Sequence, residues 1–136
     1  MSRQTKIAIG KYLTLCIVPI LLYACTNDHA YDISFCTKLT EDISCANDRN
    51  NFRAGDRVYA MVESEKPFTE KVIISTLYIV GRIKRGEIST QKWTINPGDN
   101  YAYDYVDFVE QSQGTYEFEF TNESGDVLAS EKIEIQ

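Results

Sequence analysis

The segment Gly114-Thr115-Tyr116-Glu117-Phe118-Glu119-Phe120 has the most regular alternation of apolar and polar residues in the chain. Its three aromatic side chains fall on one face and its Thr and Glu side chains on the other, because successive side chains of a strand point to opposite sides. The turn-prone stretch 122–126 follows it. The segment therefore predicts a half-buried β-strand that enters a hairpin.

The same period of two recurs along the rest of the chain. Val58, Ala60 and Val62 share one face of another clear segment, and Asn96-Pro97-Gly98-Asp99 is a strong turn signal between segments. No segment after residue 24 has a helical period. Short strands at regular intervals in about 100 residues predict an antiparallel sandwich. Further strands are expected at 57–63, 71–80, 87–95, 101–109 and 127–135.

Two segments resemble bacterial immunoglobulin-like domains. Phe52-Arg53-Ala54-Gly55-Asp56-Arg57-Val58-Tyr59-Ala60 is similar to the opening of a core strand in these domains. The segment 114–120, followed by Gly125-Asp126-Val127-Leu128-Ala129-Ser130, is similar to their closing hairpin. The resemblance covers residues 50–136 and implies an all-β, antiparallel immunoglobulin-like sandwich of about seven strands. The chain lacks their inter-sheet cysteine pair, and Trp93 falls later than their core tryptophan.

The N-terminal region carries a different motif. Leu22-Tyr23-Ala24-Cys25 resembles the lipobox of bacterial lipoproteins, and it follows a mostly apolar run that contains Pro19. A basic, acid-free stretch precedes that run, as in secretory signals. A membrane span needs about 20 apolar residues, so an uncleaved anchor is the less favoured alternative. The resemblance implies that a signal helix, residues 1–24, is cleaved and that Cys25 receives a diacylglyceryl group and usually a third chain such as palmitate.

A lipidated Cys25 would hold the protein to the cell envelope through two or three acyl chains. Thr26 stands where an Asp would resemble an inner-membrane retention signal, so we expect the outer membrane. The polar residues that follow have no periodicity and predict a tether over residues 25–34. The sandwich domain is expected over residues 35–136.

Removal of the signal would make the chain strongly acidic. Three of the 14 basic residues lie in the signal and all 20 acidic residues follow it, so 11 basic residues would face 20 acidic ones, a net charge of −9. This charge argues against nucleic acid and against charge-driven binding to anionic lipid. The remaining length suits one domain with its own core. We expect a protein partner in the envelope.

Two of the four cysteines remain once Cys16 is discarded and Cys25 is lipidated. Cys36 and Cys45 would then lie in an oxidising compartment, so we expect a disulfide between them. A metal site is the alternative, but the spacing to the only histidine, His29, does not resemble a zinc site and a fourth ligand is missing. The sequence predicts no metal and no cofactor.

The residue inventory also bears on catalysis. The expected domain has no histidine and, after a disulfide, no free thiol, so a base and nucleophile of the hydrolytic type are missing. Gly81 and Gly86 flank a hairpin and do not precede a helix, as a phosphate-binding loop would. A carboxylate pair could act on glycosides, but no pair stands out. The inventory therefore predicts that the protein is not an enzyme.

Oxygen-bearing side chains near the 96–99 turn could ligate Ca²⁺. Their spacing is not that of an EF-hand, and alternation places Asp104 and Asp107 on opposite faces of a strand. We therefore expect a solvated acidic strand instead of a calcium site. The residues concerned are Asp99, Asn100, Asp104 and Asp107.

Two features are candidate partner contacts. Tyr101, Tyr103 and Tyr105 should share one strand face. We expect this face in the core, whereas an exposed face would form an aromatic strip suited to a sugar or a partner strand. The second feature is a basic hairpin tip, which either adds solubility or contacts an acidic partner. Its residues are Arg82, Lys84 and Arg85.

Together these observations predict a lipid-anchored envelope protein that acts as a non-catalytic binding or interaction module. The alternative is a periplasmic inhibitor of a hydrolase such as lysozyme, since Ser112-Gln113-Gly114-Thr115-Tyr116 faintly resembles the loop that such inhibitors insert into their target. We favour a structural role for this segment as the start of a strand. A closed barrel would favour the inhibitor, and an open sandwich of two sheets would favour the interaction module.

Overall fold

The computed structural model describes residues 30–136, of which Tyr31–Gln136 form one compact unit. The expected signal, the lipidation site Cys25, His29 and half of the expected tether lie outside the described residues. Within the described part there is no helix of the length and apolarity needed to cross a membrane.

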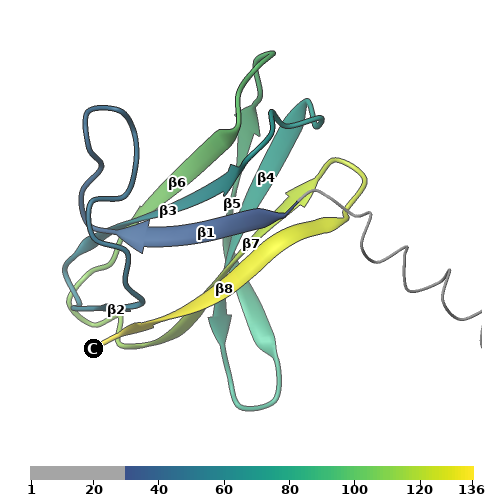
Figure 1. The fold of residues 1–136 in the computed structure, drawn as a ribbon. Helices are drawn as coiled ribbons and strands as arrows, with labels where there is room; N and C mark the ends of the chain where they lie inside the picture. Colours follow the sequence, from purple (N-terminus) through teal and green to yellow (C-terminus); the bar gives the residue numbers. More distant parts are fainter. Residues whose placement is uncertain (1–29) are drawn as a thin grey trace, which may run out of the picture. The chain divides into compact units, whose positions relative to one another are not determined.

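The described chain forms eight strands in two sheets (Figure 1), so the all-β prediction is confirmed. About seven strands were expected. Six of the eight match segments located in the sequence, and the other two are β1 and the two-residue strand β2. The strands are β1 (Tyr31–Cys36), β2 (Asn51–Phe52), β3 (Arg57–Ser64), β4 (Val72–Val80), β5 (Arg85–Thr94), β6 (Tyr101–Asp107), β7 (Gly114–Asn122) and β8 (Val127–Ile135).

The domain begins earlier than expected, because β1 starts at Tyr31 inside the segment assigned to the tether. Tyr31, Ile33 and Phe35 alternate with polar residues and pack on the core. The ring of Tyr31 lies 5.7 Å from that of Phe68. The polar residues between these apolar ones made the segment look like a linker, although they occupy the solvent face of a strand.

The sheets have the strand orders β1-β3-β6 and β2-β8-β7-β4-β5. All neighbours are antiparallel except β2, which runs parallel to the end of β8. No ladder joins the two sheets within residues 30–136, so the domain is an open sandwich and not a closed barrel. The edge strands β5 and β6 therefore border one side of the sandwich without backbone pairing between them.

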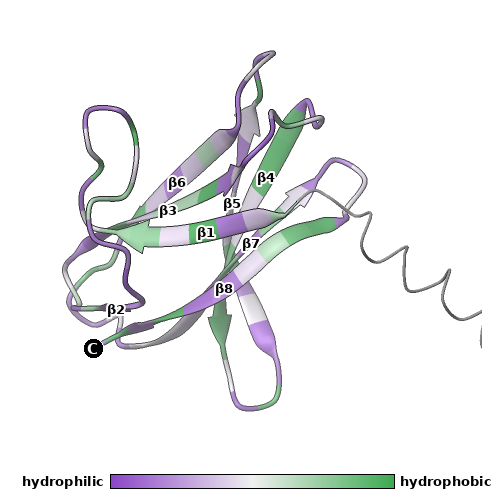
Figure 2. Ribbon diagram, viewed as in Figure 1, coloured by the Kyte–Doolittle hydropathy of each residue, from purple (hydrophilic) through white to green (hydrophobic). Residues whose placement is uncertain are grey.

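The two sheets enclose a single apolar core, as the alternation in the sequence predicts. Val58, Ala60 and Val62 of β3 and the rings of Phe118 and Phe120 of β7 are all buried. Hydrophobic residues occur mainly on the strands, and the long β1–β2 connection is mostly hydrophilic (Figure 2). The core forms because the strands other than β5, which is exposed along most of its length, turn buried apolar residues toward the opposite sheet.

The disulfide between Cys36 and Cys45 is present, which confirms the expected pairing. It joins the end of β1 to the following loop, with 5.4 Å between the two Cα atoms and a sequence separation of 9. In the chain-entropy model, closing a loop of this length stabilises the fold by about 2.5–3 kcal/mol. The disulfide thus fixes the long connection between β1 and β2 against the three-stranded sheet.

Candidate functional site

The tyrosines of β6 lie on the outer face of the three-stranded sheet, so the prediction that they belong to the core is wrong. Ala102 is 1 % exposed and occupies the core side, whereas Tyr105 is 47 % exposed. The register explains this orientation, because Ala102 pairs with the buried Val62 of β3. Tyr101, Tyr103 and Tyr105 do share one face, as alternation requires, but it is the outward one.

Aromatic side chains from both sheets meet at the open side of the sandwich. Tyr103 of β6 lies 4.6 Å from Trp93 of β5, measured between ring centroids. Tyr59 of β3 lies 6.2 Å from Tyr103 and 5.7 Å from Tyr105. These separations are typical of favourable aromatic pairs. The rings therefore connect the two edge strands β5 and β6 where no backbone hydrogen bonds do.

A cleft of about 480 Å³ opens beside these rings, between the two sheets. The core residues Ile73, Ala102 and Phe120 contribute apolar surface to it. A carboxylate, an amide, an ammonium and three hydroxyls add polar groups, so the cleft has mixed character. Its remaining lining residues are Ser75, Gln91, Lys92, Trp93, Tyr103, Asp104 and Tyr105.

Asp104 is the most unusual residue of the cleft. It follows Ala102 on the core side of β6, and its carboxylate accepts a hydrogen bond from the Ser75 hydroxyl of β4 at 3.0 Å and one from the Tyr105 N–H at 2.7 Å. Burial raises the pKa of the Asp104 carboxyl, and the two hydrogen bonds oppose that rise. Within residues 30–136, no Lys or Arg nitrogen forms an ion pair with this carboxylate.

The residues considered for Ca²⁺ are not brought together. Asp107 faces outward and receives two hydrogen bonds from the Arg57 guanidinium, at 2.6 and 3.0 Å, which lower the pKa of the Asp107 carboxyl. Asp99 caps the 96–99 turn by accepting the N–H of Asn96, and the Asn100 amide donates to the Ser64 carbonyl. The expectation of a solvated acidic strand is wrong for Asp104, which is half-buried between the sheets.

The basic hairpin tip contains only two of its three expected residues. Arg82 and Lys84 lie in the turn, where a Cβ on Gly81 would come within 2.7 Å of the Lys84 carbonyl oxygen. Between them, Ile83 is 95 % exposed. The hairpin extends past the neighbouring strands in Figure 1. The tip is thus an exposed isoleucine between two cations.

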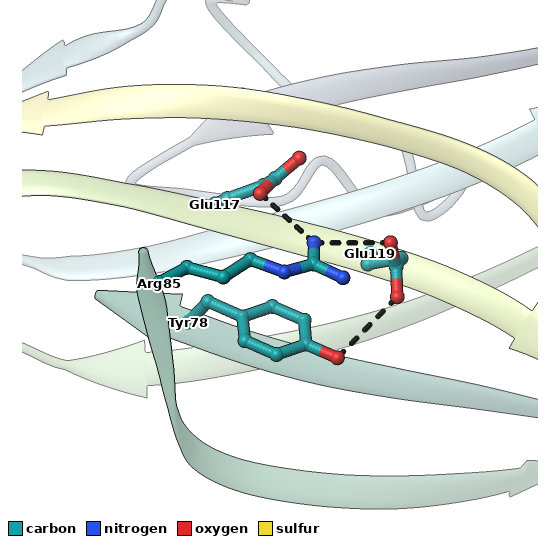
Figure 3. Close-up of polar contacts among 4 residues, drawn as sticks. All are labelled: Tyr78, Arg85, Glu117 and Glu119. Carbon is teal, nitrogen blue, oxygen red and sulfur yellow. Dashed lines mark hydrogen bonds and ion pairs between the residues drawn. The ribbon is translucent and has the colours of Figure 1, made fainter. Parts of the chain in front are cut away.

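Arg85 is a structural residue of β5 and not part of the tip. Its guanidinium lies 3.7 Å above the Tyr78 ring and bonds Glu117 at 3.0 Å and Glu119 at 3.1 Å (Figure 3). The Tyr78 hydroxyl donates to Glu119 at 3.4 Å. Burial, with the nearby Glu119 charge, raises the pKa of Tyr78. These contacts hold the base of the hairpin to β7 on the outer face of the five-stranded sheet.

Sequence reasoning missed Trp93, Ser75 and Asp104 as members of one site. A signal for Asp104 was available, because Ala102, Asp104 and Val106 occupy the strand phase opposite to the tyrosines. If the tyrosines of β6 face outward, alternation places the Asp104 carboxylate on the inward face of the same strand. Ser75 and Trp93 carry no such signal, since they reach the cleft from other strands.

Replacing Asp104 with asparagine tests the burial of its charge. Folding raises the pKa of Asp104. At pH values between its ordinary and its raised pKa, the native protein therefore binds more protons than the unfolded chain. Above this pH range Asp104 is ionised and lowers the free energy of unfolding. Below this range Asp104 is protonated and no longer lowers it. We expect Asp104→Asn to raise the free energy of unfolding, relative to the parent protein, increasingly as pH rises from about 3 to 7, as measured by urea unfolding.

Asp107→Asn is the matched control on the same strand. Arg57 lowers the pKa of Asp107 in the folded protein. Ionised Asp107 therefore stabilises the fold at neutral pH, and this stabilisation is lost as the pH falls through the pKa of the folded state. The two variants should therefore shift stability in opposite directions at neutral pH. A loss of stability in Asp104→Asn that is independent of pH would contradict the buried-charge argument.

Comparisons with known proteins place few constraints on this site. No protein-family model matches the chain, and no curated protein matches it either. Among solved structures, the superoxide reductase (neelaredoxin) from Ignicoccus hospitalis is similar at a TM-score of 0.48 and 10 % identity, with 79 % of this chain and 81 % of that chain covered. Two single-residue variants of that protein give TM-scores of 0.49 and 0.47, also at 10 % identity. They cover 84 % and 79 % of this chain, and 86 % and 81 % of their own.

These neighbours correct one prediction. They are enzymes by name, which contradicts the prediction that this protein is not an enzyme, and that prediction is withdrawn. With TM-scores below 0.5, the similarity provides no argument for a reductase activity in this chain.

Proposed function

We propose that this chain is a lipid-anchored protein of the bacterial envelope, held in the outer membrane through Cys25, and that its β domain binds a partner at the cleft between β5 and β6. The lipobox resemblance of Leu22-Tyr23-Ala24-Cys25 supports the anchor. The Cys36–Cys45 disulfide supports a location outside the cytoplasm, since disulfides persist mainly in oxidising compartments.

We further propose that the sandwich is immunoglobulin-like. Its connectivity supports this, because β1, β3 and β6 form one sheet while β4, β5, β7 and β8 share the other. Tyr116, near the start of β7, donates its hydroxyl to the Ser112 carbonyl at 2.8 Å. A tyrosine bonded to the backbone a few residues upstream, at this corner, is a recurring feature of immunoglobulin domains.

The observation that carries the binding proposal is the composition of the cleft. Trp93 and Tyr103 form an aromatic wall beside an apolar floor, and Asp104 supplies one half-buried charge. Ligand sites are typically concave, mostly apolar and supplied with a few polar groups, with volumes of roughly 300–1,000 Å³. The cleft has this volume and concave form, with apolar and polar surface in similar measure, whereas the hairpin tip projects from the sheet and presents Ile83 between two cations.

The inhibitor alternative receives no comparable support. The segment 112–116 begins β7, and Tyr116 is buried with its hydroxyl bonded to the Ser112 carbonyl. A side chain held in this way is not presented to a target enzyme. The open arrangement of the sheets also supports the interaction module over the inhibitor.

Photo-cross-linking in cells tests the site. We expect a photoreactive residue at Gln91, exposed at the cleft, to link the full chain to a discrete partner. The same residue at Lys132, exposed on β8, should not. A third position, Ile83, reports on the hairpin tip. Equal products from Gln91 and Lys132, or products from Ile83 alone, would contradict a binding cleft.

A further inference from the structure

We propose that the cleft recognises an ammonium group on an apolar stem, such as a lysine side chain or an aliphatic amine, and that Asp104 is its counter-charge. This rests on the proposed binding function and specifies its ligand. The first support is the state of Asp104, whose carboxylate is half-buried and has no ion pair within residues 30–136. Buried charges in proteins are generally paired, because an unpaired one loses hydration without compensation.

The aromatic wall supports the same class of ligand. A cation within about 6 Å of an aromatic ring face is attracted by the negative face of the ring. The chain already uses this interaction next to the cleft, where the Arg57 guanidinium lies 4.4 Å from the Tyr105 ring. Trp93 and Tyr103 line the cleft without a comparable contact among the described residues, so they provide the cation-binding rings.

The hydrogen bonds of Asp104 favour an ammonium over a guanidinium. Each carboxylate oxygen already accepts one hydrogen bond, Oδ2 from Ser75 and Oδ1 from the Tyr105 N–H. A compact ammonium needs only one oxygen, whereas a guanidinium binds best when both oxygens are available side by side. The apolar floor at Ile73, Ala102 and Phe120 suits methylene groups behind the charged head.

A metal ion fits the site less well. Within residues 30–136, no group of three or more His, Cys, Asp or Glu residues could hold a metal ion. Among the described residues that line the cleft, Asp104 is the only carboxylate. A single carboxylate beside aromatic rings therefore matches an organic cation better than a hard divalent cation.

The single tryptophan makes the proposal directly measurable. Trp93 is the only tryptophan of the chain, so tryptophan fluorescence, excited selectively over the nine tyrosines, reports on the cleft. Full chain in detergent is titrated with Nα-acetyl-lysine methylamide and with its uncharged analogue, Nα-acetyl-norleucine methylamide. We expect saturable binding of the lysine derivative and at least tenfold weaker binding of the norleucine derivative. Cadaverine, a free diamine, is titrated in the same way. Tighter binding of cadaverine than of the lysine derivative would indicate a small-molecule amine as the ligand, and the reverse order would indicate a lysine side chain of a protein.

Three variants complete the test. Asp104→Asn should weaken binding of the lysine derivative at least tenfold, and Asp107→Asn should leave it unchanged. Tyr103→Leu keeps an apolar side chain but removes the aromatic ring. It should therefore weaken the binding of the lysine derivative more than the binding of the norleucine derivative. Equal binding of both derivatives, or full binding by Asp104→Asn, would overturn the ammonium proposal. Absence of binding by all three probes would overturn it too.

The proposed function can fail separately from this proposal. Cross-links from Gln91 together with no preference for the charged probe would retain a binding cleft and reject the ammonium ligand. Loss of the Gln91 cross-links would reject the binding cleft itself.

Discussion

Replacing Cys25 with serine is expected to release the protein from the membrane completely. The proposed anchor consists of two or three acyl chains on this one sulfur and its amine, and each buried methylene contributes about 0.8 kcal/mol to membrane binding. A serine hydroxyl cannot form the thioether, so none of this binding remains. Detergent phase partitioning and intact mass would show a protein that is either unprocessed or in the aqueous phase.

Cys16→Ser is the matched control, because Cys16 lies in the segment expected to be removed. It should leave both the mass of the processed protein and its partitioning unchanged. A Cys25→Ser protein that loses residues 1–24 and still enters the detergent phase would show that the lipoprotein proposal is wrong.

Replacing Phe118 with alanine is expected to cost about 3–5 kcal/mol of folding free energy. Phe118 is 0 % exposed on β7, which lies between β4 and β8, and its ring lies 5.5 Å from that of Phe35 in the other sheet. Truncation removes apolar contacts in both sheets and leaves a cavity that packed strands cannot close. Domains of this size have a total stability of about 5–15 kcal/mol, so the variant would be close to unfolding.

Equilibrium unfolding in urea with the disulfide intact would measure this loss. Val127→Ala is the control, since Val127 is 56 % exposed and should change stability by less than about 0.5 kcal/mol. Phe118→Leu keeps most of the apolar volume, so its loss of unfolding free energy should lie between the losses of Phe118→Ala and Val127→Ala. A loss below about 1 kcal/mol for Phe118→Ala would mean that the two sheets do not depend on this contact.

Several features of the fold follow directly from local sequence patterns. The alternation in 114–120 predicts the buried face of β7, and the same period predicts the core residues of β3. The expected pairing of Cys36 with Cys45, which the structure contains, was reached by assigning Cys16 to the proposed signal and Cys25 to the proposed lipid anchor. Each of these predictions depends on nearest neighbours or on residue identity, which the sequence contains explicitly.

Other features are decided by contacts between distant segments. The local sequence predicts that Arg85 lies at a solvent-exposed tip. In the structure, ion pairs with Glu117 and Glu119, more than 30 residues away, hold Arg85 on the sheet beside Tyr78. The local sequence predicts that Tyr31 belongs to a tether. In the structure Tyr31 packs against Phe68 and the core. A charged or polar residue looks exposed in sequence until its partner is known.

The sequence by itself determined which residues of a strand lie together, because the period of two follows from backbone geometry. It placed the three tyrosines of β6 on one face. Only the tertiary structure decided that this face is the outer one, since the two faces of a strand are equivalent until another sheet covers one of them. Pairing of Ala102 with the buried Val62 makes that choice. The same choice turns Asp104 inward to Ser75, 29 residues earlier in the chain and in the opposite sheet, and so creates the cleft.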